Sequence, residues 1–245
     1  MQLLLIEAGN TYVKVAQLFK NGQLELLGKY SSRKLEMVLE PLLDKKEIHR
    51  IVFASVGPVE IDNSIQRISQ LSNISVIQVK TPSHDFGVKN AYSEYQYLGI
   101  DRWLTLVAIH QSYQQPTVIV DIGTALTFDV LAEDGTHLGG WIAPGYQLMM
   151  KSVLENTTKV FSDRDHVDSL ELATNTADGL KNGCRAALLG LIEYGLKQAH
   201  EDLGVEPHVI LCGGGVIHLP KKWAQQYTHR SDLVLEGLAL YAKHR

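Results

Sequence analysis

Two carboxylates, Glu7 and Asp121, occupy the same local setting at two places in the chain. The segment from Leu3 reads LLLIEAGNTYVKV and the segment from Thr117 reads TVIVDIGTALTFDV, so each carboxylate ends an apolar strand and precedes a turn with glycine and hydroxyl residues. The carboxylates are 114 residues apart. We expect two facing half-sites, because a repeated strand and acidic turn suits a polyphosphate held between two lobes.

The turns carry groups that suit phosphate. Gly9 and Gly123 let phosphate oxygens approach backbone N–H groups, where a Cβ would block them. Side-chain donors are added by Asn10, Thr11 and Thr124. The carboxylates would repel phosphate, so they are expected to act through a cation or a bound water. Lys14 would neutralise a phosphate if its strand faces the cleft. One such turn alone is more often an ordinary hairpin, whereas two copies favour a nucleotide cleft.

A glycine run, Gly213-Gly214-Gly215, lies outside the repeat and directly follows the apolar segment HVILC. A run of this kind is either a tight turn or a bare stretch of backbone against which adenine or ribose can lie. At the end of the last strand of a duplicated fold, we favour the second interpretation for Gly213 and Gly214.

The segment Gly99-Ile100-Asp101-Arg102 also lies outside the repeat, at the start of a predicted helix. In one interpretation, Asp101 interacts with the helix dipole and Arg102 is a surface residue. In the other, Asp101 is a general base beside a cation that grips a substrate anion, as phosphoryl transfer to a hydroxyl requires.

Hydrophobic periodicity places these groups on an α/β framework. The first half predicts strands within 2–30, at 51–56 and at 74–79, with helices through 35–43 and 65–71, an irregular segment over 81–99 and a helix after it. The second half predicts three strands from 117 to 143, helices near 146–154 and 175–200, a strand at 208–212 and a helix at 233–243. Glycines within the long helix, Gly183, Gly190 and Gly195, predict close packing against another element, since each costs roughly 1 kcal/mol relative to alanine.

The repeat therefore predicts two lobes. Residues 1–115 would carry the first phosphate loop and the substrate segment, and residues 116–245 the second phosphate loop and the adenosine-side glycines. Duplicated βββαβα lobes of this kind form the fold shared by actin, sugar kinases and heat-shock ATPases, with a central nucleotide cleft.

Composition sets limits on the partners. The chain has 245 residues, of which 45% are hydrophobic, so it can form a substantial core without disulfides. Its two cysteines, Cys184 and Cys212, are isolated in apolar stretches and are expected to be buried free thiols in a reducing compartment. A net charge of -4 provides no basic footprint for nucleic acid. No apolar run approaches the ~20 residues that span a bilayer. We expect a cytoplasmic protein with neither nucleic-acid nor membrane partners.

Taken together, the motifs resemble those of type III pantothenate kinases. The set comprises EAGNT at 7–11, GIDR at 99–102, DIGTALT at 121–127, GGWIAPG at 139–145, NTADG at 175–179 and the late GGG. The motifs occur in order over nearly the whole chain, and the joint set is much more specific than any member.

The resemblance implies ATP-dependent phosphorylation of the primary hydroxyl of pantothenate to 4'-phosphopantothenate, the first committed step toward coenzyme A. It implies that Asp101 is the proton acceptor and that Asp121 holds a monovalent cation, K+ or NH4+, alongside Mg2+. The implied first phosphate loop consists of Glu7, Ala8, Gly9, Asn10, Thr11, Tyr12, Val13 and Lys14, with Thr124 contacting ATP in the second. The implied pantothenate pocket consists of Tyr92, Gly99, Ile100, Asp101, Arg102 and Thr176. A homodimer is also implied.

Glu7 departs from the family pattern, because similar proteins usually carry Asp at this position. The charge is kept and the side chain is one methylene longer, so we expect altered metal or ATP affinity rather than loss of activity. The departure leaves open an alternative, a nucleotide-binding regulatory accessory protein of the same family with weak or no kinase activity. A third option is a related sugar or acetate-type kinase on the same fold.

Overall fold

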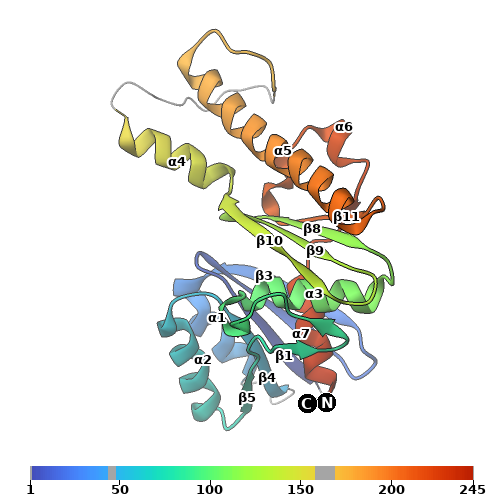
Figure 1. Ribbon diagram of the computed structural model, residues 1–245. Coiled ribbons are helices and arrows are strands. Elements are labelled where there is room, and N and C mark those ends of the chain that lie inside the picture. The colour runs from blue at the N-terminus through green and yellow to red at the C-terminus, as the bar shows by residue number, and fades with distance from the viewer. Residues whose placement is uncertain (1, 44–47, 158–168, 245) are drawn as a thin grey trace. The chain divides into compact units, whose positions relative to one another are not determined.

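The structure, a computed structural model, describes residues 2–43, 48–157 and 169–244. The chain divides into two compact units. Unit 1 comprises Met1–Ser112 and Asp232–Arg245, and unit 2 comprises Tyr113–Ser231. Each unit contains one five-stranded mixed sheet with its own helices (Figure 1).

Unit 1 is built on a sheet with strand order β3-β2-β1-β4-β5. The strands are β1 (Gln2–Ala8), β2 (Tyr12–Leu18), β3 (Leu24–Ser31), β4 (Ile48–Ser55) and β5 (Ser75–Gln78). The first three strands pair antiparallel, whereas β1, β4 and β5 run parallel. The expected order of three strands followed by alternating helices and strands is therefore confirmed.

Helices cover both faces of this sheet (Figure 1). Alternate residues of β1 point to opposite faces. Leu4 and Ile6 pack with α1 (Leu35–Leu43) and α2 (Val59–Leu71) in one buried apolar cluster. On the other face, β1 and β4 contact α7 (Leu233–His244), and α3 (Ile100–Ser112) contacts β4.

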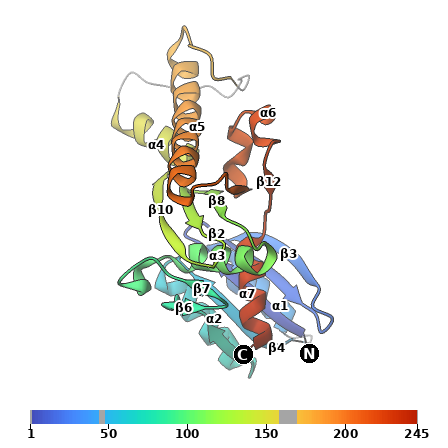
Figure 2. The same cartoon turned by 45° about the vertical axis from the view of Figure 1, so that its right-hand side comes forward.

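The last helix lies in unit 1, although the division at residue 115 assigned it to the second lobe. Figure 2 shows α7 alongside α3, and the two helices are in direct contact. The indole Nε1 of Trp103 donates a hydrogen bond to the hydroxyl of Tyr241 at 2.9 Å, and both side chains are buried. A Cβ at Gly237 would overlap the carbonyl oxygen of Leu104, so the two helices approach closely. Burial of this apolar surface explains why α7 returns to the first sheet.

The segment over 81–99 is more ordered than an irregular loop. It contains a short hairpin of β6 (His84–Asp85) and β7 (Val88–Lys89), then a 3-10 turn, η2 (Tyr95–Tyr97), directly before α3. Strands of two residues are too short for periodicity to reveal.

Unit 2 repeats the sheet of unit 1, with strand order β10-β9-β8-β11-β12. The strands are β8 (Thr117–Ile122), β9 (Ala125–Leu131), β10 (His137–Pro144), β11 (His208–Cys212) and β12 (Thr228–His229). As in unit 1, the first three pair antiparallel and the others run parallel to the first. The predicted duplication is thus confirmed at the level of strand order and direction.

One face of the second sheet carries the helices of unit 2. Residues of α4 (Tyr146–Asn156), of the 28-residue α5 (Thr176–Leu203) and of α6 (Lys221–Ala224) share one apolar cluster with β8 and β9. At Gly195 of α5, an added Cβ would lie 2.7 Å from the ring of Phe128, which confirms the expected close packing. At Gly183 and Gly190 that expectation is wrong within the described residues, because an added Cβ would meet no atom within 4 Å.

Two further expectations concern the cysteines and the membrane. Cys184 and Cys212 are free and buried, as predicted. Burial raises the pKa of the Cys184 thiol, which keeps it protonated and unreactive. Among the helices of the described residues, none combines the length and the apolar character that crossing a membrane requires.

Candidate active site

The first acidic turn holds its carboxylate in an ion pair. Glu7 near the end of β1 lies opposite Lys14 of β2 in the antiparallel register. The Nζ of Lys14 is 3.5 Å from Glu7 Oε2 and 3.5 Å from Oδ1 of Asp232, the residue that precedes α7. The three side chains are 23%, 23% and 31% exposed, so a ligand can still reach them. Lys14 therefore stands between two carboxylates at the mouth of the turn.

The backbone of this turn is tight. The N–H of Gly9 donates to the carbonyl of Tyr12 at 2.9 Å, and the side chains of Asn10 and Thr11 are exposed. A Cβ at Gly57, just after β4, would lie 2.8 Å from the carbonyl oxygen of Gly9. Sequence reasoning missed Gly57, although a glycine after the strand IVFASV was a signal for it.

The second acidic turn is closed by glycines. The N–H of Gly123 donates to the carbonyl of Ala125 at 2.8 Å, and the N–H of Gly145 donates to the carbonyl of Thr124 at 2.9 Å. A Cβ at Gly145 would overlap the carbonyl oxygen of Gly123. Gly145, which the sequence marked only as the break before α4, thus lets the start of α4 lie directly against the turn.

The structure brings Asp121 together with the late glycine run. Cys212, the last residue of β11, lies beside Asp121 in the parallel register. Gly213 follows with φ +83°, and its Cβ would overlap both Oδ1 of Asp121 and the carbonyl oxygen of Ile122. Only glycine fits this position, because of both the close approach and the left-handed backbone.

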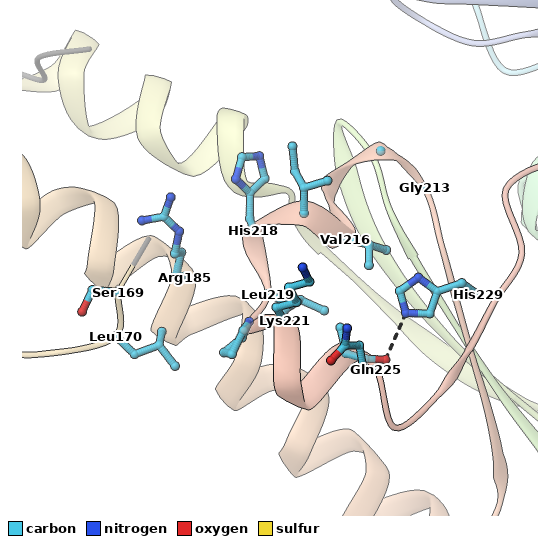
Figure 3. A pocket seen from close by; sticks show the side chains of 14 residues that line it. Ser169, Leu170, Arg185, Gly213, Val216, His218, Leu219, Lys221, Gln225 and His229 are labelled. Carbon is cyan, nitrogen blue, oxygen red and sulfur yellow. Dashed lines mark hydrogen bonds between the residues drawn. The ribbon is translucent and has the colours of Figure 1, made fainter. Parts of the chain in front are cut away.

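A cavity of about 870 Å³ opens beside this glycine run in unit 2 (Figure 3). Gly213 and Gly214 form part of its wall, and Arg185 and His229 approach it from opposite sides (Figure 3). The Nε2 of His229 lies 3.0 Å from the carbonyl oxygen of Ala224, which fixes its ring. The remaining lining residues are Ser169, Leu170, Val216, Ile217, His218, Leu219, Pro220, Lys221, Ala224 and Gln225.

Stacked side chains hold one side of this cavity. The rings of His218 and Tyr146 stack with centroids 3.9 Å apart, and Cζ of Arg185 lies 5.3 Å from the centroid of the Tyr146 ring. Tyr146 and Arg185 are each 7% exposed. The stack joins η3 (Gly214–His218), α4 and α5, so it connects the glycine run to the helical layer.

In unit 1, the residues expected to bind the acceptor substrate gather at the N-terminus of α3. Oδ1 of Asp101 accepts the N–H of Arg102 at 2.8 Å, in the first turn of the helix, where the helix dipole stabilises its negative charge. Arg102 is 4% exposed, and its Nη1 donates to the hydroxyl of Tyr92 at 3.0 Å. Arg102 is thus not the surface residue of the first interpretation. Arg102 thus contacts both Tyr92 and Asp101.

Thr176 lies in unit 2, whereas Tyr92, Asp101 and Arg102 lie in unit 1. It is the exposed first residue of α5, after Asn175, whose side chain accepts the N–H of Asp178 at 2.9 Å. An exposed hydroxyl at a capped helix N-terminus is placed to bind a polar ligand.

Within the part of the chain that the structure describes, no three His, Cys, Asp or Glu side chains lie close enough to hold a metal ion by themselves. The carboxylate of Asp121 and the carbonyl of Ile122 both border the point that a Cβ of Gly213 would fill. Two hard oxygen donors of this kind fit a monovalent cation, and Mg2+ usually takes most of its ligands from water and substrate phosphates.

A family model described as type III pantothenate kinase matches residues 3–198 of this chain. The chain belongs to the type III pantothenate kinase family. Its relatives in the family include proteins named type III pantothenate kinase from Pseudoalteromonas translucida and Nitrosococcus oceani. The first relative is 36% identical, and the match covers 96% of this chain and 94% of the relative. The second is 33% identical, and the match covers 98% of this chain and 94% of the relative.

Solved structures confirm the fold expected of a type III pantothenate kinase. A conserved protein from Campylobacter jejuni, described as a Baf family transcriptional activator, aligns with a TM-score of 0.60 at 21% identity, covering 98% of both chains. The activator of 2-hydroxyisocaproyl-CoA dehydratase from Clostridium difficile, solved with bound ADPNP, aligns with a TM-score of 0.52 at 15% identity, covering 99% of this chain and 94% of that one. The chain therefore has the actin-like and sugar-kinase fold that the sequence predicts.

Proposed function

We propose that this protein transfers the γ-phosphoryl group of ATP to the primary hydroxyl of pantothenate. The observation that carries the proposal is that the buried Arg102 is hydrogen-bonded to Tyr92 and adjoins Asp101 at the start of α3. A guanidinium and a phenol are suited to a carboxylate such as that of pantothenate, and a carboxylate beside them is suited to accept a hydroxyl proton.

In this mechanism the acceptor hydroxyl lies against Asp101. As its oxygen forms a bond to the γ-phosphorus, its proton passes to the carboxylate of Asp101, and the bond from phosphorus to the β–γ bridging oxygen breaks to release ADP. The dipole of α3 stabilises the negative charge of the Asp101 carboxylate before the transfer. Positioning by Tyr92 and Arg102 lowers the entropic cost of bringing the hydroxyl to the phosphate.

Groups suited to ATP occur in each unit. The backbone N–H groups of the turn after Glu7 and the ammonium of Lys14 are suited to phosphate oxygens, as is the hydroxyl of Thr124. The cavity beside Gly213 is large enough for a nucleoside. Use of ATP and the two free, buried thiols support a cytoplasmic location.

Two kinds of cation would take part in the proposed reaction. Asp121 and the carbonyl of Ile122 would hold K+ or NH4+, and Mg2+ would be carried by the phosphates of ATP. When bound, these cations neutralise the negative charge that develops on the phosphates during transfer.

We also propose a homodimer in which α5 packs against a second copy of the chain. Small residues recur on the exposed side of this helix: Gly179, Gly183, Ala186, Ala187 and Gly190. Tyr194, one turn further on, is 63% exposed while its ring stacks on Trp141. A glycine-rich helix face that meets no other part of the described chain allows another backbone to approach closely.

The test of the function is direct. Protein incubated with ATP, Mg2+, K+ and pantothenate should form 4'-phosphopantothenate and ADP in equal amounts, measured by chromatography and mass spectrometry. Absence of product above a no-enzyme control would reject the kinase and favour the accessory-protein alternative. Faster turnover of a sugar or acetate than of pantothenate would favour the third option.

A further inference from the structure

Asn90 directly follows β7 and is 8% exposed. Its side-chain Nδ2 donates to the carbonyl oxygens of Pro82 and Tyr95, each at 3.3 Å. Its Oδ1 accepts the backbone N–H of Tyr92 at 3.0 Å. One buried amide thus ties together three separate points of the loop between β5 and α3.

Both ends of the segment that Asn90 holds connect to residues proposed to bind pantothenate. At one end, the hydroxyl of Tyr92 accepts a hydrogen bond from Nη1 of Arg102 at 3.0 Å. At the other end, the carbonyl of Tyr95 also accepts the N–H of Leu98 at 3.1 Å, directly before Gly99. Asn90 therefore fixes the path of the chain between Tyr92 and the start of α3.

The chemistry of asparagine is required for this task. An amide supplies two donors and an acceptor in one plane, whereas aspartate supplies acceptors alone and alanine supplies neither. Loss of the amide would remove one hydrogen-bond partner from each of three partly buried backbone groups, those of Pro82, Tyr92 and Tyr95, so we expect the loop to shift. All three side-chain bonds end within residues 82–95, away from the turn at Glu7 in sequence.

We propose that Asn90 is a positioning residue for the acceptor substrate, which sets the affinity for pantothenate by holding the hydroxyl of Tyr92 on the guanidinium of Arg102. The proposal rests on the proposed function. Asn90 does not touch the reacting atoms, and it acts through Tyr92.

The experiment measures the KM for each substrate and kcat in four variants: Asn90→Ala, Asn90→Asp, Tyr92→Phe and the double variant Asn90→Ala with Tyr92→Phe. Asn90→Ala should raise the KM for pantothenate about tenfold, the scale of a lost hydrogen bond, with a smaller change in kcat. The KM for ATP should stay within about twofold. Asn90→Asp keeps the acceptor for Tyr92 but sets a carboxylate oxygen against the carbonyl oxygens of Pro82 and Tyr95, so it should raise the KM for pantothenate at least as much as Asn90→Ala.

The double variant separates positioning from general stability. If Asn90 acts through the Tyr92 hydroxyl, Asn90→Ala should change the KM by less than about twofold in the Tyr92→Phe background. Ser69→Ala is the matched control, because Ser69 is 2% exposed and its hydroxyl donates to the carbonyl of Gln66 at 2.7 Å on α2. It should lower the melting temperature without changing either KM.

Three results would overturn the proposal: an unchanged KM for pantothenate in folded Asn90→Ala, a parallel rise in the KM of both substrates, or full additivity with Tyr92→Phe. If Asn90→Ala does not fold, the same cycle is run with the isosteric Asn90→Asp, and the same outcomes decide. A wild-type protein that makes no phosphopantothenate would reject the proposed function instead, so the two failures are distinguishable.

Discussion

The two acidic turns share their position in the sheet but differ in what surrounds the carboxylate. Glu7 faces Lys14 across the strand pair, and Asp232 lies on the other side of that lysine. Asp121 faces Thr127 at the corresponding place, and Gly213 presses against its Oδ1. The first turn therefore carries a cation of its own, and the second presents oxygen atoms around a glycine.

The two copies of the duplicated turn therefore differ in how each can neutralise the charge of a phosphate. A lysine beside the first turn can neutralise phosphate directly. The second turn has a threonine in that place, so under the proposed function a bound cation would neutralise the phosphate charge there. In both units a glycine after the fourth strand makes room for the turn, since added Cβ atoms at Gly57 and Gly215 would lie 2.8 Å and 2.9 Å from the carbonyl oxygens of Gly9 and Ile122.

The largest effect is expected outside both turns, at Asp101. If the turns bind ATP and Asp101 takes the proton, Asp101→Asn should lower kcat by about 10²-fold or more, because a general base contributes on that scale. The affinity for ATP should be retained, as measured by calorimetry with a non-hydrolysable analogue. Lys14→Met is the contrasting variant and should weaken that affinity. An equal loss of ATP affinity in Asp101→Asn would show that Asp101 also contributes to ATP binding, so that ATP binding does not belong to the two turns alone.

Gly213→Ala tests the oxygen-rich setting of the second turn. The added methyl group would displace Asp121 and strain a backbone with φ +83°, so we expect a destabilisation of about 1–3 kcal/mol and a raised KM for ATP. Gly204→Ala is the matched control, because Gly204 has φ +71° and a Cβ there would meet no described atom within 4 Å. Chemical denaturation of both variants separates the contact with Asp121 from backbone strain. Equal destabilisation would show that the contact contributes nothing.

Exchange of K+ for Na+ tests the cation at Asp121. We expect activity to fall several-fold, on the order of 3- to 10-fold, because the proposed site would hold K+ and the smaller Na+ would draw its oxygen ligands closer together. Asp121→Asn should lower activity in K+ and abolish the difference between the two salts. The measurement is the initial rate at matched ionic strength, and identical rates for the wild type in both salts would contradict a cation site at the second turn.

Much of this fold could be predicted from the sequence, because the repeat preserves both the carboxylates and the apolar strands before them. Strands such as β8 are long apolar runs with turn residues at their ends, and a buried parallel strand requires that pattern. Asp101 and Arg102 were also recognisable, because they lie together at a helix start. These features are local in the chain.

Features that depend on distant contacts could not be predicted. Gly57 and Gly145 are needed because other segments approach them within a few ångströms in space. The return of α7 to the first sheet likewise depends on the apolar surfaces of α3 and β1, which periodicity within α7 does not identify. The hairpin of β6 and β7 is too short to show alternation, so the hydrogen bonds of Asn90 were hidden as well.

Glu7→Asp should have the smallest effect and tests the comparison most closely. Shortening the side chain by one methylene withdraws the carboxylate from Lys14 by about 1.5 Å, the length of one C–C bond. Lys14 would then be less tightly paired and more available to phosphate, so the KM for ATP should fall by about two- to threefold, the scale of a partly exposed ion pair. Steady-state kinetics at several Mg2+ concentrations would measure this change.

The reciprocal variant, Asp121→Glu, is the control for Glu7→Asp. Gly213 lies directly against the Asp121 carboxylate, so an extra methylene would push that carboxylate against the backbone of Gly213. Asp121→Glu should therefore lower activity more than Glu7→Asp changes it. If Asp121→Glu and Glu7→Asp changed activity equally, the surroundings of the two carboxylates would not determine which side-chain length each position requires. If Glu7→Asp left the dependence on ATP and Mg2+ unchanged, Glu7 would be a neutral replacement for the family's usual aspartate.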